Sequence, residues 1–455
     1  MDRKPVTAVI IGAGHRGIGC GRYALAHPDE MRIVGVADPR ESRRREAAEV
    51  FDLSSDQCWE SAEELAALPK RADAVLNATM DGDHVATSIP LLEAGYDILL
   101  EKPFATNEEE MWRLVECARR HGRRVMICHV LRHAPFYAAI RERVARGEIG
   151  DVVNVQTAEH VSYHHMASCF VRGKWRRRDL CRSSMLMAKC CHDLDLIAWM
   201  KSGVAPRAVA SFGSNMQFRP ERAPRGAGTR CLVDCPIESD CLYSARKHHI
   251  DHPDRWASYV WDVSHLPGRS EPRTIEEKIA ELKRPDNPFG RCVWKMDMDI
   301  VDHQSVTIEF EDGSTATHNM VGGTARPSRA IHLIGASGEI QGVLEESRFA
   351  IRHVDLRPGR EYSEEVVDLN AQGDLGGGHG GGDERLVADF VRVLRGEKPS
   401  LSTTSLEDSV HGHLIGFCAD RAMEERRVVE VDLQGLLAPQ EPREFGPHCG
   451  DWGET

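Results

Sequence analysis

Three glycines and one aspartate near the N-terminus have the residue types and the spacing of a phosphate-binding turn. The apolar run of residues 7–14 ends with Gly12 and Gly14, and Gly17 follows, which completes the pattern Gly-x-Gly-x-x-Gly. The first glycine permits a tight turn, the second lets a pyrophosphate approach the backbone, and the third lets a helix pack closely on the strand. Asp38 ends the next apolar run and could accept hydrogen bonds from a ribose hydroxyl. The pattern predicts a dinucleotide site.

The charge of Asp38 indicates which dinucleotide binds. Its carboxylate would repel the 2′-phosphate of NADP, so NAD is the expected cofactor. Arg40, Arg43, Arg44 and Arg45 lie just downstream and keep NADP open as the less favoured alternative. Charge runs of this kind are, however, usually solvated helix faces.

The elements around these residues alternate as the strands and helices of a parallel sheet do. Further strands are expected at residues 31–37, 73–79, 96–100 and 124–130, and helices at residues 18–27, 84–94 and about 109–120. Thr106 and Glu109 have the spacing of a capping box before the last of these helices. Ligands bind beyond the carboxyl ends of the strands in such sheets. The polar residues at or just past these ends are Thr79, Glu101, Lys102, His129 and Arg132.

Several short motifs are spread along the chain. They are the turn at residues 12–17, Ala78-Thr79 with His84 soon after, Glu101-Lys102-Pro103-Phe104-Ala105, residues 146–150, His192-Asp193-Leu194-Asp195 before residues 196–199, and residues 334–339. Together they resemble the Gfo/Idh/MocA family of oxidoreductases from about residue 6 to residue 433. The resemblance implies an α/β protein, with an N-terminal Rossmann parallel sheet and a C-terminal α+β domain built on a large, mainly antiparallel open sheet.

The resemblance also implies where the chemistry occurs. A nicotinamide would lie across the strand ends, with Lys102 hydrogen-bonded to the reacting hydroxyl or carbonyl and His192 acting as general acid or base. Oxidation of an alcohol needs a proton acceptor and a cation that stabilises alkoxide character, and a lysine beside a histidine supplies both. The expected cofactor-binding residues are Gly12, Gly14, His15, Arg16, Gly17, Asp38, Arg40, Thr79, His84, Glu101, Lys102 and Arg132. The expected substrate-binding residues are His165, Trp175, Arg176, His192 and Asp195.

One position departs from the family pattern. The family commonly has an aspartate four residues before the histidine, where this chain has Ala188 followed by Lys189. Lys189 and His192 would share a helix face if the helix begins near Ala188, so Lys189 is a further catalytic candidate. Either Lys189 takes over part of the proton handling or the chemistry differs from simple alcohol oxidation.

Three functions are compatible with these residues. The first is an NAD-dependent dehydrogenase acting on a secondary alcohol of a sugar or polyol, with net production of NADH. The second is an NAD-dependent glycosidase that oxidises a ring hydroxyl transiently, eliminates the aglycone, adds water and reduces the product; the missing aspartate slightly favours it. The third is a non-catalytic NAD sensor or scaffold, which would be indifferent to the loss of Lys102 and His192.

The chain divides into three predicted regions. They are a Rossmann domain at residues 1–150, a substrate and oligomerisation domain at residues 151–435, and a loose tail at residues 436–455. His379, in a glycine-rich stretch that spans residues 376–382, could reach the site or belong to a simple hinge.

An insertion at about residues 214–300 carries a group of cysteines. Cys231, Cys235 and Cys241 lie close together, and Cys292 follows near its end. Four thiols could hold a structural zinc ion in tetrahedral geometry. Separate free thiols are the favoured alternative, because two Cys-x2-Cys pairs are missing.

The composition argues against several classes of partner. The chain has 58 basic and 71 acidic residues and a net charge of −13, which would repel a nucleic acid. No apolar run approaches the ~20 residues of a membrane span, and no secretory signal precedes the first strand. Fourteen cysteines, taken as reduced thiols, favour the cytoplasm. The expected partner is a small carbohydrate or polyol, with a homodimer or homotetramer formed through the second-domain sheet.

Overall fold

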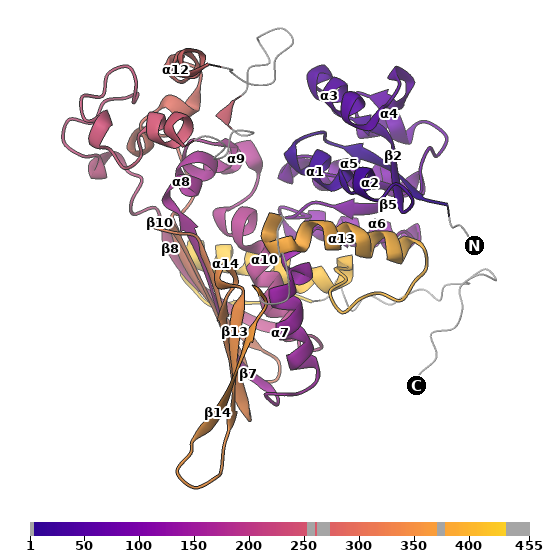
Figure 1. Ribbon diagram of the computed structural model, residues 1–455, viewed down its shortest axis with the longest axis vertical. Coiled ribbons are helices and arrows are strands. Elements are labelled where there is room, and N and C mark those ends of the chain that lie inside the picture. Colours follow the sequence, from indigo (N-terminus) through magenta and orange to yellow (C-terminus); the bar gives the residue numbers. More distant parts are fainter. Residues whose placement is uncertain (1–3, 253–259, 262–273, 371–377, 434–455) are drawn as a thin grey trace.

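The computed structural model describes residues 4–252, 260–261, 274–370 and 378–433. They form two sheets with helices packed on them (Figure 1). The predicted tail at residues 436–455 lies outside the described residues, as does the first part of the glycine-rich stretch. Among the helices that the structure describes, none combines the length and the apolar character that crossing a membrane requires.

The first sheet has six parallel strands in the order β3-β2-β1-β4-β5-β6. Its strands are β1 (Val6–Ile11), β2 (Met31–Ala37), β3 (Cys58–Trp59), β4 (Ala74–Asn77), β5 (Asp97–Leu100) and β6 (Val125–Ile127). The chain runs outward from β1 to β3 and then returns to β4 on the other side of β1. This reversal creates the crevice at the carboxyl ends of β1 and β4 where such sheets bind ligands. The predicted Rossmann fold is confirmed.

The helices of the first sheet follow the expected alternation, with local differences. They are α1 (His15–Gly21), α2 (Tyr23–Ala26), α3 (Glu41–Phe51), α4 (Ala62–Ala66), α5 (His84–Glu93) and α6 (Glu108–Arg120). The helix expected at residues 18–27 is two helices, and it starts earlier than predicted. The residue that caps α6 is Asn107 and not the predicted Thr106, because the Asn107 side chain accepts the Glu110 N–H (2.9 Å) while the Thr106 hydroxyl donates to the Glu110 carboxylate (2.9 Å).

The second sheet has nine strands in the order β14-β13-β12-β11-β7-β10-β9-β8-β15. They are β7 (Val152–Ser162), β8 (Pro206–Ser214), β9 (His303–Phe310), β10 (Thr315–Thr324), β11 (Ser328–Gly335), β12 (Gly338–Val343), β13 (Arg348–Val354), β14 (Tyr362–Asp368) and β15 (Val429–Glu430). The β7–β10 pair is parallel and the other pairs are antiparallel, as expected of a mainly antiparallel sheet.

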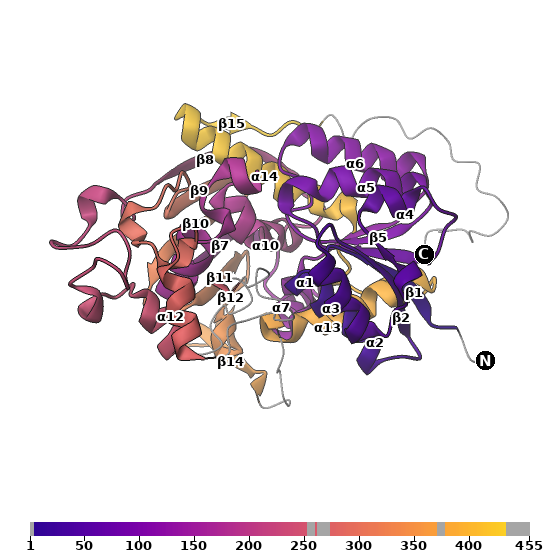
Figure 2. The same cartoon turned by 90° about the horizontal axis from the view of Figure 1, so that it is seen from above.

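Helices cover the face of the second sheet that is turned toward the first. They are α7 (Pro135–Ala145), α10 (Met185–Met200) and α14 (Leu406–Glu425). In both views α7 and α10 lie between the two sheets (Figures 1 and 2). Nearly every residue of α10 is buried, so its polar side chains must find partners inside the protein.

The end of the chain returns to the first sheet. Helix α13 (Gly378–Leu394) places Leu386 and Phe390 in the same core as Ile10 and Met126. Leu414 of α14 packs into the other core of that sheet. This return carries residues from the last quarter of the chain to the dinucleotide crevice.

The insertion is mostly irregular and has a small core of its own. Its described elements include η8 (Lys247–Asp251) and α12 (Ile275–Lys283), and its buried residues include Cys231, Ala245 and Leu282. Helices α8 (Tyr163–His165) and α9 (Arg178–Cys181) border it, because the Tyr163 ring lies 5.3 Å from that of His248 and the Arg178 N–H donates to Asp299 (2.9 Å).

Candidate functional site

The turn between β1 and α1 has the shape that a pyrophosphate requires. Gly12 has a φ of +83°, and a Cβ atom there would lie 2.7 Å from the Ala78 carbonyl oxygen. A Cβ atom on Gly17 would lie 2.2 Å from the Gly12 carbonyl oxygen. At Gly14 the nearest atom is the flexible Nη1 of Arg43, 3.2 Å away. The first and third glycines thus leave no space for a side chain, whereas the backbone at the second can be approached by a ligand, as a dinucleotide turn needs.

Asp38 follows β2 and supports this turn. Its side chain is 3% exposed, and its Oδ2 and Oδ1 atoms accept the N–H groups of Ala13 (2.9 Å) and Arg40 (2.9 Å). A carboxylate oxygen has a second lone pair, so Asp38 can hold the turn and still accept a ribose hydroxyl. Arg43 lies 3.9 Å from Asp38 Oδ2, which keeps a cation beside this carboxylate.

Arg16 joins three segments at the start of α1. It donates to Glu101, just after β5 (2.6 Å), and to Asp383 of α13 (2.8 Å). Burial disfavours both charges of the first pair, yet their attraction raises the pKa of Arg16 and lowers that of Glu101. Burial and the charge of Arg16 lower the pKa of the neighbouring His15. Arg16 and Glu101 are predicted to bind the cofactor, and the contacts seen here hold the start of α1 in place beside the glycine turn.

Thr79 and His84 link β4 to the turn after β5. The Thr79 hydroxyl donates to Asn77 Oδ1 (2.9 Å). His84 Nδ1 lies 2.7 Å from the Pro103 carbonyl oxygen, and its Nε2 lies 3.2 Å from that of Thr79. Because Pro103 follows Lys102 directly, the buried His84 ring helps to position that lysine.

Lys102 extends from the end of β5 to α10. Its Nζ atom donates to the carbonyl oxygen of Ala188 (2.7 Å), the residue that stands where the family pattern has an aspartate. Helix α10 begins at Met185 and not near Ala188, because the Ser184 hydroxyl accepts the Met187 N–H (3.1 Å) and caps it there. An ammonium group has three hydrogens, so Lys102 keeps donors beyond the one given to Ala188.

His192 lies one turn along α10 and is surrounded by other histidines. The centroid of its ring is 5.9 Å from those of His129 and His379, and its Nδ1 has no hydrogen-bond partner within the described residues. Burial, followed by the charge of Lys102, lowers the pKa of His192 well below 6.5. Burial and the charge of Arg132 do the same to His129. Both imidazoles are therefore neutral near pH 7 and can accept a proton.

His379 reaches this group from the glycine-rich stretch. It has a φ of +51°, and Gly380 and Gly381 follow with values of +65° and +83°. Three successive residues in this left-handed region turn the chain so that the His379 ring faces His192. Its Nδ1 lies 3.0 Å from Asp383 Oδ2. Sequence reasoning left His379 between a site and a hinge; the only signal was a histidine among glycines.

Lys189 contacts the second sheet. Its Nζ lies 2.9 Å from Glu159 Oε1 on β7, and Glu159 also pairs with Arg329 of β11 at 2.6 Å. Arg329 in turn lies 3.2 Å from Asp193. The network balances two cations with two anions in a buried place, so Lys189 is less available for proton transfer than Lys102. Sequence reasoning missed Glu159 and Arg329, whose charges sit within ordinary strand patterns.

Arg132 and Asp195, predicted to contact cofactor and substrate, pair with each other. The guanidinium donates twice to the carboxylate, at 2.7 Å and 2.6 Å, and the side chains are 2% and 1% exposed. Burial raises the pKa of Asp195, although Arg132 opposes this. The pair joins η3 (Val130–His133), just after the first sheet, to α10.

The predicted substrate residues after β7 lie in different places. His165 is close enough to the site for Lys189, Arg329 and Lys102 to act on its ring, and burial is the main cause of its low pKa. Trp175 donates from Nε1 to Asp81 beside β4 (3.1 Å). Arg176 lies 3.4 Å from Asp297 at the end of the insertion. Trp175 and Arg176 therefore contact carboxylates beside β4 and in the insertion.

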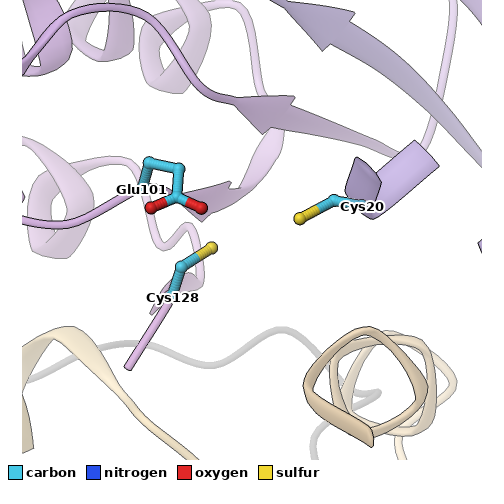
Figure 3. A group of neighbouring side chains, drawn as sticks. All are labelled: Cys20, Glu101 and Cys128. Atoms are coloured by element: carbon cyan, nitrogen blue, oxygen red, sulfur yellow. The ribbon is translucent and has the colours of Figure 1, made fainter. Parts of the chain in front are cut away.

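Cys20, Glu101 and Cys128 converge behind the glycine turn. Their side chains point toward a common space (Figure 3), and their potential ligand atoms lie within 4.8 Å of one another. Glu101 is already paired with Arg16, and burial raises the pKa of Cys128 well above its usual range. A protonated thiol beside a satisfied carboxylate indicates packing here. Two other described groups have similar spacing: Glu93 with Cys117 and His121, and Cys190 with Asp193 and His318.

The four cysteines predicted to bind zinc line one small cavity. No three of their sulfurs, all in the described part of the chain, form a group within 4.8 Å of one another. A tetrahedral zinc ion with Zn–S bonds of about 2.3 Å needs sulfurs about 3.8 Å apart. The sulfur positions therefore do not support the zinc prediction, although the four residues line the same cavity.

Comparison with known proteins agrees with the fold. A family model described as "Oxidoreductase family, NAD-binding Rossmann fold" matches residues 6–129. A second, described as "Oxidoreductase family, C-terminal alpha/beta domain", matches residues 141–431. Together they cover both sheets.

Individual relatives are more distant. The oxidoreductase YteT of Bacillus subtilis is 25% identical over 330 residues, which are 70% of this chain and 72% of YteT. An inositol 2-dehydrogenase of Corynebacterium glutamicum is 27% identical over 40% of this chain and 52% of its own length. Among solved structures, a levoglucosan dehydrogenase in complex with NADH and levoglucosan is similar in fold, with a TM-score of 0.66 and 16% identity over 94% of this chain and all of that one.

Proposed function

The chain belongs to the Gfo/Idh/MocA family of oxidoreductases, and from this premise we propose that it is an NAD-dependent dehydrogenase acting on a secondary alcohol of a sugar or polyol. One observation carries the proposal: the Lys102 ammonium at the end of β5 meets the part of α10 that presents the neutral His192. Relatives named for inositol and levoglucosan support a polyhydroxylated substrate.

The residues of the crevice fit NAD. Gly14 leaves the backbone approachable for the pyrophosphate, and Asp38 provides the acceptor for a ribose hydroxyl. NAD, when bound, would accept the hydride from the substrate carbon or return it. The remaining steps fall to side chains of the protein.

Lys102 and His192 divide the proton chemistry. The Lys102 Nζ donates a hydrogen bond to the substrate oxygen and stabilises alkoxide character as it develops. The His192 imidazole, kept neutral by burial, accepts the hydroxyl proton. The ion pair of Arg132 and Asp195 joins η3 to α10, the helix that carries His192. The His379 ring lies beside that of His192 from the side of α13.

A substrate panel tests this proposal directly. Purified protein with NAD is offered inositols, free sugars and aryl glycosides, and both NADH and released aglycone are measured. We expect net NADH with at least one sugar or polyol. Aglycone released without net NADH would replace the dehydrogenase by the glycosidase that the alanine at position 188 leaves open. If neither NADH nor aglycone is produced but the protein still binds NADH, the sensor or scaffold remains as the function.

Loss of the Asp38 carboxylate should weaken the cofactor and change its selectivity. Asp38→Ala removes acceptors for the Ala13 amide and for a ribose hydroxyl, and a hydrogen bond to a charged group contributes about 1.5–3 kcal/mol. We expect NADH to bind about 10- to 100-fold more weakly, with a smaller preference over NADPH. Fluorescence titration with each nucleotide measures this, and Glu41→Gln, an exposed carboxylate nearby, is the control. Undiminished NADH affinity would show that the ribose lies elsewhere.

The pH dependence of turnover should reflect the low pKa of His192. Its neutral form is the base, and burial with the charge of Lys102 moves its pKa well below 6.5. Protonation therefore sets in only at lower pH, so kcat/KM for alcohol oxidation should persist below pH 6.5 and then fall. His192→Asn should abolish this acid limb along with most of the turnover. An acid limb centred at or above pH 6.5 would contradict the assignment.

We further propose that the open face of the second sheet mediates self-association. Helices α10 and α14 cover one face, whereas Val153, Phe212 and Val366 on its strands are more than half exposed. Sedimentation at several concentrations tests this, with Phe212→Glu expected to shift the protein toward the monomer.

A further inference from the structure

His192 needs a route by which its proton can leave. In the proposed reaction it accepts one hydroxyl proton for each substrate molecule that is oxidised. His192 is 4% exposed, and its Nδ1 has no hydrogen-bond partner in the part of the chain that the structure describes. Burial and the charge of Lys102 lower its pKa well below 6.5, so the imidazolium is unfavourable there. A neighbouring group must therefore take the proton before the next turnover.

Two histidine rings lie beside His192, and they differ in their access to water. The ring centroids of His129 and His379 are both 5.9 Å from that of His192. His129 is 1% exposed, and burial together with the charges of Arg132 and Lys102 lowers its pKa well below 6.5. The side chain of His379 is 36% exposed. Of these two neighbours, His379 is the one from which a proton can reach solvent.

Asp383 fixes the tautomer of His379. One carboxylate oxygen of Asp383 lies 3.0 Å from His379 Nδ1, and the other accepts from Arg16 (2.8 Å). Burial alone would raise the pKa of Asp383, but its contacts with His379 and Arg16 lower it. An ionised carboxylate can only accept, so Nδ1 of the neutral His379 carries the hydrogen and Nε2 keeps its lone pair. That lone pair can accept a proton, and the carboxylate stabilises the imidazolium that forms.

The backbone holds His379 in this position. Its φ of +51° is in the left-handed region, which residues other than glycine seldom adopt. At Gly382 a Cβ atom would lie 2.3 Å from the Val130 carbonyl oxygen, so the glycine-rich stretch lies directly against η3. The place of the ring beside His192 is therefore determined by the packing of this stretch.

The titratable and charged groups that face His379 come from four elements. They are His15 and Arg16 of α1, His192 of α10, Arg329 of β11 and Asp383 of α13 itself. The two arginines disfavour a positive charge on His379, whereas the carboxylate of Asp383 favours it. These opposing effects suit a group that accepts a proton and then releases it.

We propose that His379, oriented by Asp383, carries the substrate proton from His192 to solvent. The substrate O–H bond breaks as His192 becomes an imidazolium, and an N–H bond of that ring then breaks as the proton binds to Nε2 of His379. Water takes the proton from His379, which returns both rings to the neutral form. A centroid distance of 5.9 Å allows this transfer through one hydrogen bond or one bridging water. The role rests on the proposed function, because it requires His192 as the base.

The test is the rescue of a variant by imidazole added to the solution. In His379→Gly the glycine suits the left-handed φ and leaves space for imidazole. We expect kcat for alcohol oxidation to fall by about 10- to 100-fold, at or below the low end of the range for a proton-transfer group because water can partly replace the ring. Imidazole should restore turnover in proportion to its concentration. The affinity for NADH, measured by fluorescence titration, should stay unchanged.

Two further variants serve as controls. Asparagine also tolerates a left-handed φ, so His379→Asn should lose turnover similarly but gain less from imidazole, because its side chain occupies the space. His121→Ala removes an exposed histidine at the end of α6 and should behave as the wild type. The ratio of turnover in H₂O to that in D₂O should be larger for both His379 variants than for the wild type, because proton transfer then limits the rate.

Failure of the relay and failure of the proposed function give different results. If the wild type produces NADH and His379→Gly turns over equally fast, the relay is overturned while the dehydrogenase stands. Lost turnover that imidazole does not restore would also overturn it, because His379 would then contact the nucleotide or maintain the fold, and a fall in NADH affinity would identify the former. Wild-type protein that produces no NADH with any substrate of the panel would overturn the dehydrogenase and the relay together.

Discussion

Lys102→Met is expected to lower kcat by about two to four orders of magnitude, as the loss of a proton-transfer or electrostatic group usually does. Methionine keeps the length and the apolar stem of the side chain but removes the ammonium that contacts Ala188. The affinity for NADH should change little, because Gly12, Gly14 and Asp38 hold the nucleotide. Steady-state kinetics with the substrate found in the panel, together with NADH titration, measures both quantities.

A matched control separates this effect from a general loss of charge. Lys70→Met removes an exposed lysine of the same domain whose ammonium lies over the Tyr96 ring, away from the strand ends. Its turnover should match that of the wild type. If Lys102→Met also kept full turnover, the lysine would have no part in the chemistry and a sensor or scaffold would be favoured.

Asp195→Ala is expected to reduce the free energy of unfolding by about 3–5 kcal/mol, because it leaves the Arg132 guanidinium buried without its carboxylate. The cost is large because both partners are nearly inaccessible to water and because Arg132 also stacks on Trp199, 5.5 Å from the ring centroid. Chemical denaturation monitored by tryptophan fluorescence measures the change. If Asp195 contacted only the substrate, Asp195→Ala would leave the unfolding free energy of the free protein unchanged, and that result would contradict the prediction.

The double variant Arg132→Met with Asp195→Leu provides the control for this prediction. Replacing both charges by apolar side chains removes the unpaired charge, so the double variant should be more stable than either single variant. If the double variant instead lost as much unfolding free energy as the two single variants together, the two residues would not be coupled as a pair.

The sequence contained most of what determines the first sheet. The glycines at 12, 14 and 17 require a specific backbone, and the strand at Met31–Ala37 has the predicted bounds because its residues are apolar apart from the exposed Arg32. The two-residue strand β3 was not predicted, since two residues carry no periodicity. The cap of α6 was displaced because Thr106 and Asn107 are both suitable, and only their contacts with Glu110 decide between them.

The site was harder to predict because its partners are distant in sequence. The sequence placed Arg132 just past a strand end and Asp195 close to His192, but it could not show that the two side chains would pair with each other. Lys189 was chosen for its distance from His192, whereas the fold of β7 and β11 gives it Glu159 as a partner in a network with Arg329. His379 reaches the site only because α13 packs against the first sheet, and no local sequence pattern predicts that packing.

A crystal structure of the protein with NADH would test the central claim most directly. The account predicts the pyrophosphate over Gly14, a ribose hydroxyl on Asp38, and the nicotinamide between the ends of β4 and β5 with Lys102 Nζ and the His192 ring at its reactive face. A nicotinamide bound away from Lys102 and His192 would contradict it.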